Sequence, residues 1–202
     1  MVNLANLTER QRELVEASIG IIADNGIQNL TIKNLSKKMG FSEPAIYRHF
    51  KSKTDILLAI LSLFEVYIRD NNTRGTSNSA SSLNNLNEIF KQHFDTFSKN
   101  RALASVVFAE EIFQNDKRLA EKIFSIMEAN FKIIQTIIEK GQKSNEIRTD
   151  IEAEQLTLII MGSLRLIIKK WTLSNYHFEI KDLGKELWQS VKKILSIREG
   201  EK

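Results

Sequence analysis

The chain has 202 residues, of which 42% are hydrophobic and 27% are charged, a balance typical of a globular protein with a sizeable core. It contains no cysteine, which excludes disulfides, thiolate nucleophiles and cysteine-ligated zinc. The formal net charge is +4, with eight Lys/Arg against five Asp/Glu in residues 1–53, so the charge permits a nucleic-acid partner without demonstrating one.

The first predicted element is a helix that begins after Thr8 and ends at Asn25-Gly26. One proline and eight glycines in the whole chain favour long helices over strands. Thr8 suits the N-cap, and Gln11 stands at the capping-box position. One apolar stripe of this helix should pack on the two helices that follow, and it comprises Leu14, Ala17, Ser18, Ile21 and Ile22.

A second, shorter helix is predicted from Thr31 to Met39. Thr31 is a good N-cap, and Gly40 follows the last periodic residue, where a left-handed conformation ends many helices. The apolar face of this helix consists of Ile32, Leu35 and Met39.

A third helix follows at once, with Ser42 as its cap and Pro44 in its first turn. Ile46 and Phe50 can turn inward, because they are four residues apart on one face. Another face and its flank carry Ala45, Tyr47, Arg48 and His49. A helix, a glycine turn and a helix with these side chains predict a helix-turn-helix with a recognition helix.

The run from Pro44 to Leu57, PAIYRHFKSKTDIL, resembles the signature of the TetR/AcrR family of bacterial transcriptional regulators. The signature has a small residue, an aliphatic residue, Tyr, any residue, His-Phe and then a Ser-Lys-acidic-Leu run. Thr54 is inserted between Lys53 and Asp55, and the resemblance covers residues 8–58. It implies an all-α fold of about nine helices. The implied domains are a DNA-binding domain at 1–55 and a helical effector-binding and dimerisation domain at 56–202.

The recognition helix needs side chains that reach base edges and donors that bind phosphates. Arg48 and His49 can do either, and Lys53 lies beyond the helix, where it can bind the flanking backbone. Exposed side chains of this kind are often only solvated surface, but the motif and its spacing favour DNA binding. The predicted DNA contacts are Thr31, Lys33, Ser42, Glu43, Ala45, Tyr47, Arg48, His49 and Lys53.

From Thr54 an amphipathic helix runs to Ile68, and such a helix can transmit a displacement between the two domains. Residues 71–82 are rich in Asn, Ser and Thr and are predicted to form a surface loop. Further helices are predicted at 83–98, at 101–114 and at 117–141, where Gly141 ends the helix.

Seven of the eleven phenylalanines lie between residues 90 and 131. The family resemblance implies an effector pocket here, suited to a hydrophobic or amphipathic small molecule. Periodicity alone fits a solid core as well, so both alternatives stay open. The candidate pocket residues are Phe90, His93, Phe94, Phe97, Phe108, Phe113, Phe124, Phe131 and Arg165.

The last two predicted helices, at 152–171 and 182–197, are apolar around much of their circumference. The resemblance implies that they form a four-helix homodimer interface, and the alternative is burial within one subunit. The candidate interface residues are Leu156, Ile160, Leu164, Ile167, Trp171, Leu183, Leu187, Val191 and Ile194.

Together these features predict a dimeric repressor that a small hydrophobic effector releases from a palindromic DNA operator. The alternative is a DNA-binding regulator without such an effector, controlled by a partner protein or by its concentration. An enzyme is not expected, because Glu-x-x-His pairs are absent and His49, His93 and His177 lie far apart. No metal or cofactor is predicted. The N-terminus has no signal-peptide pattern, so the expected compartment is the cytoplasm.

Overall fold

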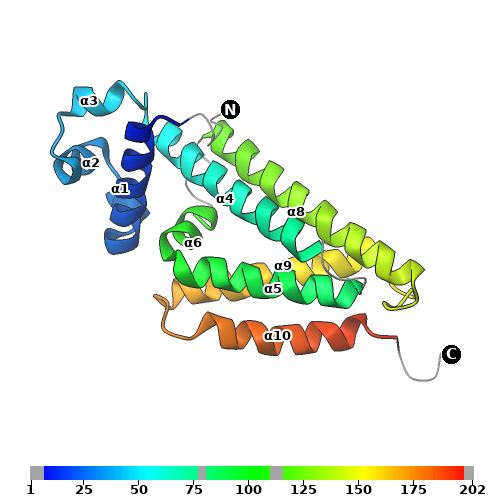
Figure 1. Ribbon diagram of the computed structural model, residues 1–202. Coiled ribbons are helices and arrows are strands. Elements are labelled where there is room, and N and C mark those ends of the chain that lie inside the picture. The colour runs from blue at the N-terminus through cyan, green and yellow to red at the C-terminus, as the bar shows by residue number, and fades with distance from the viewer. Residues whose placement is uncertain (1–6, 77–80, 110–115, 198–202) are drawn as a thin grey trace. The chain divides into compact units, whose positions relative to one another are not determined.

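The computed structural model describes residues 7–76, 81–109 and 116–197, and the regular structure in these ranges is entirely helical (Figure 1). Nine α-helices and one 3-10 turn lie in this part of the chain, which confirms the predicted all-α fold. The chain forms two compact units, Met1–Val66 with Asn100–Ser125 and Tyr67–Lys99 with Ile126–Lys202. The functional division between residues 55 and 56 stays a prediction.

Unit 1 contains the predicted helix-turn-helix. Its elements are α1 (Glu9–Asn25), the 3-10 turn η2 (Ile27–Asn29), α2 (Ile32–Met39), α3 (Glu43–Tyr47), the first part of α4 (Lys53–Thr76), and α6 (Arg101–Val107). The capping box of α1 is formed as predicted, with both reciprocal bonds between Thr8 and Gln11. The helix ends at Gly26, whose φ of 79° lies in the region that favours glycine.

A helix from much later in the chain completes the core of unit 1. Three short helices alone bury little surface, which limits their stability. Here α6 packs against α1 and η2, and it adds the buried side chains of Leu103, Val106 and Val107 to the core. The DNA-reading helices therefore rest on a core that extends beyond the predicted three-helix unit.

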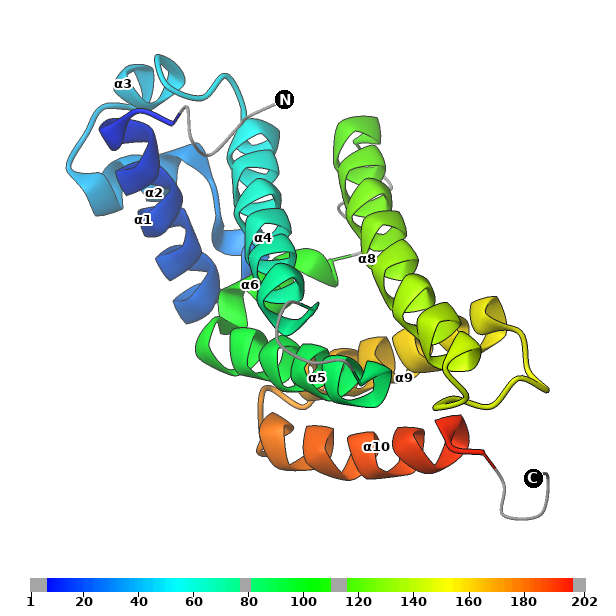
Figure 2. The same ribbon diagram turned by 45° about the vertical axis from the view of Figure 1, so that its right-hand side comes forward.

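Unit 2 is built from longer helices. They are α5 (Ser82–Lys99), most of α8 (Lys117–Lys143), α9 (Ala153–Leu173) and α10 (Ile180–Leu195). α10 packs along α5 and α9 (Figure 2). The rings of Phe90 and Trp188 lie 5.1 Å apart, and a Cβ added to Gly184 would lie 2.3 Å from the Phe94 ring. Glycine at position 184 therefore allows α5 and α10 to approach closely.

The turn after α8 connects the ends of other helices in unit 2. The Glu146 carboxylate accepts hydrogen bonds from the backbone N–H groups of Ser82, at 2.6 Å, and Leu83, at 3.2 Å. An anion at a helix N-terminus is favourable, so Glu146 serves as the cap of α5. The backbone N–H of Arg148 donates to the Leu195 carbonyl at 2.9 Å, which fastens the end of α10.

Three predicted element boundaries were wrong. α4 continues to Thr76, so part of the predicted 71–82 loop is helical. Asn, Thr and Arg can extend a helix that is already formed, since adding a residue costs less than starting a helix. α6 ends at Val107, and residues 110–114 of the predicted 101–114 helix lie outside the described residues. Gly141 lies within α8 rather than after it, and a Cβ there would lie 2.5 Å from Ile147. This glycine is required by close packing and not by a turn.

No helix in the described ranges has the combination of length and apolar character that crossing a membrane requires.

Candidate DNA-recognition site

The turn between α2 and α3 is formed by local backbone chemistry. The Thr31 hydroxyl accepts a hydrogen bond from the Asn34 N–H at 3.1 Å and caps α2, as predicted. Gly40 adopts φ 68° and ψ 26°, the predicted left-handed conformation. The Phe41 N–H then donates to the Ser36 carbonyl at 3.0 Å, which closes the end of α2. This turn starts α3 two residues later.

The recognition helix α3 is shorter than predicted. It ends at Tyr47, and Arg48 and His49 follow in a turn that is still held by backbone bonds to residues of α3. Ser42 occupies the N-cap position, but its side chain makes no capping hydrogen bond, so the expected cap is only positional. Ile46 and Phe50 are buried as predicted, and they attach the helix to the core of unit 1.

The opposite side of this segment is open to solvent. Tyr47 is 48% exposed, and Arg48 is also exposed, so both side chains are available to a partner. The exposed residues of the predicted set are Thr31, Lys33, Ser42, Glu43, Tyr47 and Arg48, and the half-buried ones are Ala45, His49 and Lys53. Direct contact with DNA stays a prediction for each of them.

Lys53 makes a contact that the sequence did not indicate. Its ammonium donates a hydrogen bond to the Ile27 carbonyl of η2 at 3.2 Å, and burial lowers its pKa below the ordinary lysine value. In this structure Lys53 therefore joins the start of α4 to the segment after α1. A phosphate contact by the same ammonium stays a prediction.

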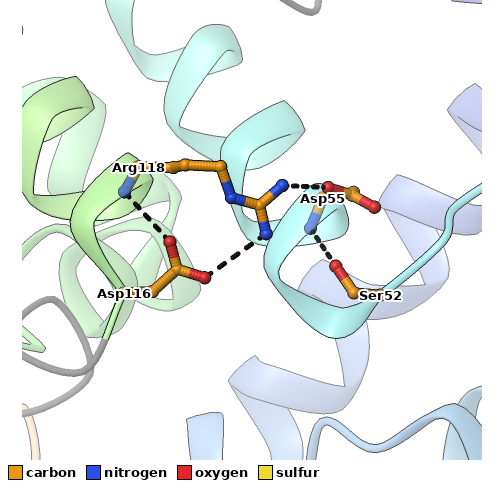
Figure 3. Close-up of polar contacts among 4 residues, drawn as sticks. All are labelled: Ser52, Asp55, Asp116 and Arg118. Carbon is orange, nitrogen blue, oxygen red and sulfur yellow. Dashed lines mark hydrogen bonds and ion pairs between the residues drawn. The ribbon is translucent and has the colours of Figure 1, made fainter.

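A charged cluster joins the first turns of α4 and α8 within unit 1 (Figure 3). The Arg118 guanidinium contacts the Asp55 carboxylate at 2.9 Å and the Asp116 carboxylate at 3.3 Å. Slight burial raises the pKa of Asp116, but hydrogen bonds from Thr54 and Arg118 outweigh it, so the pKa is lowered. Asp116 is thus a stable anion beside Arg118. A second ion pair, Lys122 with Glu65 at 2.5 Å, connects the same two helices.

The described candidate pocket phenylalanines belong to both units. Phe90, Phe94 and Phe97 are buried on α5 in unit 2, where Phe90 and Phe94 face α10. The others are dispersed: Phe108 is buried after α6, Phe124 is 63% exposed, Phe131 is half-buried, and Phe113 lies outside the described residues. Phe90 and Phe94 thus belong to the core between α5 and α10, and the effector pocket stays a prediction.

Two polar side chains on α5 have surroundings that the sequence did not reveal. Burial lowers the pKa of His93 to about 4, so its imidazole is neutral near pH 7, with its ring 5.0 Å from that of Phe97. The Gln92 Oε1 atom is buried and accepts no hydrogen bond within the described part of the chain. Arg165 is half-buried on α9, with its guanidinium 3.9 Å from the Met127 sulfur.

Most of the candidate dimer residues pack within unit 2. Leu156, Ile160, Leu164, Trp171 and Val191 are buried, Ile167, Leu183 and Leu187 are half-buried, and Ile194 is exposed. The exposed large apolar residues of α9 are instead Leu158, Ile159, Leu166 and Leu173, and we call these four residues the α9 apolar stripe. The residues of α9 are apolar around much of the helix circumference, so periodicity alone could not tell which of them face inward.

Two family models match the chain in succession. One, described as "Bacterial regulatory proteins, tetR family", matches residues 14–60. The other, described as "YsiA-like protein, C-terminal region", matches residues 63–193, which is more than half of the chain.

Known proteins resemble the chain over most of its length. The fatty acid metabolism regulator protein of Bacillus subtilis is 22% identical over 172 residues, 85% of this chain and 88% of that protein. The nucleoid occlusion factor SlmA of Haemophilus influenzae is 21% identical over 193 residues, 93% of this chain and 87% of the relative.

Solved structures share the fold. The fatty acid degradation regulator FadR of Bacillus halodurans superposes with a TM-score of 0.82 at 18% identity, covering 95% of this chain and 98% of the other. The regulator FadR of Bacillus subtilis in complex with stearoyl-CoA gives a TM-score of 0.75 at 22% identity, covering 93% and 100%.

Proposed function

The chain belongs to the tetR family of bacterial regulatory proteins, and from this premise we propose a homodimeric repressor released from its operator by a long-chain acyl ligand. It is a DNA-binding regulator of transcription. The proposal has three parts: recognition of DNA by α3, assembly through α9, and release by the ligand.

The main support for the proposal is the division of the α3 segment into an exposed side and a buried side. Tyr47 and Arg48 are exposed at its end, while Ile46 and Phe50 are buried on its other side. A helix held this way can enter the major groove with its outward side chains against base edges and phosphates. Two such helices related by a two-fold axis require a pseudo-palindromic site.

The test is to select duplexes from a random-sequence pool with the purified protein and then to measure binding of the best duplex. Arg48→Ala should weaken specific binding by about 1–3 kcal/mol and relax the sequence preference, if Arg48 reads a base. Lys51→Ala removes an equal charge from a neighbouring exposed position and is the matched control. If no sequence is enriched, or if Arg48→Ala leaves the preference unchanged, recognition by α3 is wrong.

The α9 apolar stripe supports assembly of two copies. Leu166 is 68% exposed and Leu173 is 76% exposed, and a Cβ added to Gly162, which lies between Ile159 and Leu166 on the same helix, would meet no atom within 4 Å. Large exposed apolar surfaces favour association, and an open glycine lets another backbone come close. Leu166→Glu should therefore convert a dimer to a monomer in sedimentation experiments. Gln28→Glu adds the same charge at an exposed position of unit 1 and should not change the assembly.

A long-chain acyl effector is supported by the likeness to a fatty acid metabolism regulator and to a structure that holds stearoyl-CoA. The residues of α5 are compatible with such a ligand. Burial keeps His93 uncharged near neutral pH, and Gln92 Oε1 is a buried acceptor that receives no hydrogen bond from the residues that the structure describes. Neutral groups of this kind suit a ligand with uncharged polar atoms next to an apolar chain.

Induction requires that the ligand and the operator oppose each other. Arg118 joins the start of α8 to the start of α4, which follows the recognition segment, so a shift of α8 can move α4. Thermodynamic linkage requires the selected duplex to weaken ligand binding by the same factor as the ligand weakens DNA binding, typically about 5–150-fold. Titrating stearoyl-CoA with and without duplex measures this factor, and coenzyme A alone is the control.

A DNA-binding regulator without a small effector is the second candidate, favoured by the likeness to the nucleoid occlusion factor SlmA. Equal affinity for stearoyl-CoA in both titrations, or no binding at all, would support this candidate over induction by an acyl ligand.

A further inference from the structure

The recognition helix depends on contacts outside itself. α3 has only five residues, and a helix of this length is not stable in water by itself. Its N-cap Ser42 makes no side-chain bond, and Ile46 is its only buried residue. Ile46 and Phe50, the residue three positions after the helix ends, are buried on one side of the segment, so contacts at the two ends of the helix can further restrain its orientation.

The first of these contacts is made by Gln11 of α1. Its Nε2 donates a hydrogen bond to the His49 carbonyl at 3.1 Å, two residues after the end of α3. Its Oε1 accepts from the Thr8 N–H at 3.1 Å, which orients the amide with its donor toward His49. Carbonyl groups at the end of a helix lack partners within the helix, so this bond satisfies a group that needs a donor.

The second contact is made by the preceding residue, Arg10. Its guanidinium lies 4.8 Å from the centroid of the Phe41 ring, a cation–π arrangement. Phe41 stands two residues before the start of α3. The first turn of α1 therefore touches the chain on both sides of the recognition helix, two residues before it and two residues after it.

We propose that Arg10 and Gln11 are positioning residues that orient α3 for reading DNA sequence without touching DNA themselves. The proposal rests on the proposed DNA recognition by α3. Both residues lie before residue 14, where the match to the family model begins, so the match assigns them no role. Loss of either contact permits α3 to shift on its buried anchors Ile46 and Phe50, which displaces Tyr47 and Arg48 from the base edges that they are proposed to read. Sequence discrimination then falls while attraction to phosphates remains.

The test compares Gln11→Met with Thr8→Ala. Gln11→Met removes the bond to His49 and one half of the capping box, without changing the charge. Thr8→Ala removes the other half of the box, the Thr8 hydroxyl that accepts from the Gln11 N–H at 3.2 Å, but leaves the Gln11 side chain and its bond to His49. The two variants therefore weaken the cap of α1 similarly, and only one releases the recognition segment.

The measurement is the ratio of affinities for the duplex selected by the wild-type protein and for a scrambled duplex, at several salt concentrations. Gln11→Met should lower this ratio about threefold to tenfold, the effect of one lost hydrogen bond, and Thr8→Ala should leave it unchanged. The salt dependence of Gln11→Met should equal that of the wild type, because no phosphate contact is lost. Phe41→Leu, which removes the ring that Arg10 contacts, should also lower this ratio, as Gln11→Met does.

Three results of this measurement would overturn the proposal. An unchanged ratio in Gln11→Met shows that the bond does not orient α3, and an equal fall in Thr8→Ala shows that only the stability of α1 matters. A weaker salt dependence in Gln11→Met would indicate direct contact with DNA instead of positioning. If the wild-type protein selects no duplex, the failure belongs to the proposed function. Hydrogen exchange at the Phe50 amide, which donates to the Ile46 carbonyl at 3.1 Å, then reports how firmly the end of the recognition segment is held, and equal protection in wild type and Gln11→Met would overturn the proposal.

Discussion

The DNA-reading part of unit 1 and the α5–α10 pair of unit 2 are stabilised in different ways. α2 and α3 are short, and they are fixed by a threonine cap, a left-handed glycine and side chains that bond to the backbone. α5 and α10 are long, and they are fixed by ring packing and by Gly184, which permits their close approach.

This difference predicts which changes each region tolerates. A surface held by individual polar bonds can be adjusted one bond at a time, with effects of about 1 kcal/mol each. A closely packed helix pair responds to added volume or to a buried charge with larger losses. Both tryptophans, Trp171 and Trp188, lie in unit 2, so their fluorescence reports on that unit while circular dichroism reports on all helices.

The largest expected effect is the pH dependence that His93 gives to unit 2. Its pKa in the folded protein is about 4 and that of an unfolded histidine is 6.5, so the unfolded chain takes up the proton first as the pH falls. The free energy of unfolding should therefore decrease by about 3 kcal/mol between pH 6.5 and pH 4. Urea titrations followed by tryptophan fluorescence should show this decrease reduced in His93→Gln but kept in His177→Gln. Equal losses in both variants would contradict it.

Next in size is the effect of a methyl group at position 184. Gly184→Ala should destabilise unit 2 by about 1–3 kcal/mol, because the new Cβ would overlap the buried Phe94 ring. Gln189→Ala, at an exposed position of the same helix, is the matched control and should change the stability by less than about 0.5 kcal/mol. Thermal unfolding followed by fluorescence should shift clearly only for Gly184→Ala, and equal shifts in both variants would refute the packing argument.

A smaller effect is expected in the DNA-reading region. Thr31→Ala removes the side-chain cap of α2 and should lower stability by about 1 kcal/mol, measured by circular dichroism in urea. Ser42→Ala changes an N-cap whose side chain makes no bond, so its effect should be clearly smaller. Equal effects would mean that the hydrogen bond of Thr31 does not stabilise α2.

The smallest effect on stability is expected at the charged cluster of α4 and α8. The Arg118 and Asp55 pair is partly exposed, and exposed ion pairs contribute little. Arg118→Gln should therefore leave the unfolding free energy nearly unchanged, as Lys117→Gln should. A double-mutant cycle with Asp55→Asn measures the coupling between Arg118 and Asp55. A coupling clearly above the experimental error would contradict this expectation and show that the pair stabilises the fold.

The sequence predicted the helix-turn-helix well, because its geometry follows from local chemistry. The cap at Thr31, the turn at Gly40 and the buried positions Ile46 and Phe50 can all be recognised from residue type and spacing. The end of α3 at Tyr47 could not be predicted. The bond that follows this end, from Gln11 to the His49 carbonyl, joins residues 38 positions apart, which no local pattern reveals.

The sequence was less informative about unit 2. Periodicity located α9 and α10, but nearly continuous apolar residues left open which side of α9 is buried. The role of Gly184 depends on Phe94, which is distant in sequence, so no local pattern could reveal it. The same holds for the buried environments of Gln92 and His93.

The bond between Gln11 and His49 also bears on how such a protein can change its target sequence. Gln11 bonds to a main-chain carbonyl, a group that every amino acid supplies at that position. The exposed side chains of Tyr47 and Arg48 make neither this bond nor the contact of Arg10 with Phe41. Substitutions of Tyr47 and Arg48 can therefore alter the bases that are read, while the contacts that position the helix remain. A new DNA preference can thus evolve by exchange of a few surface residues, without a new scaffold.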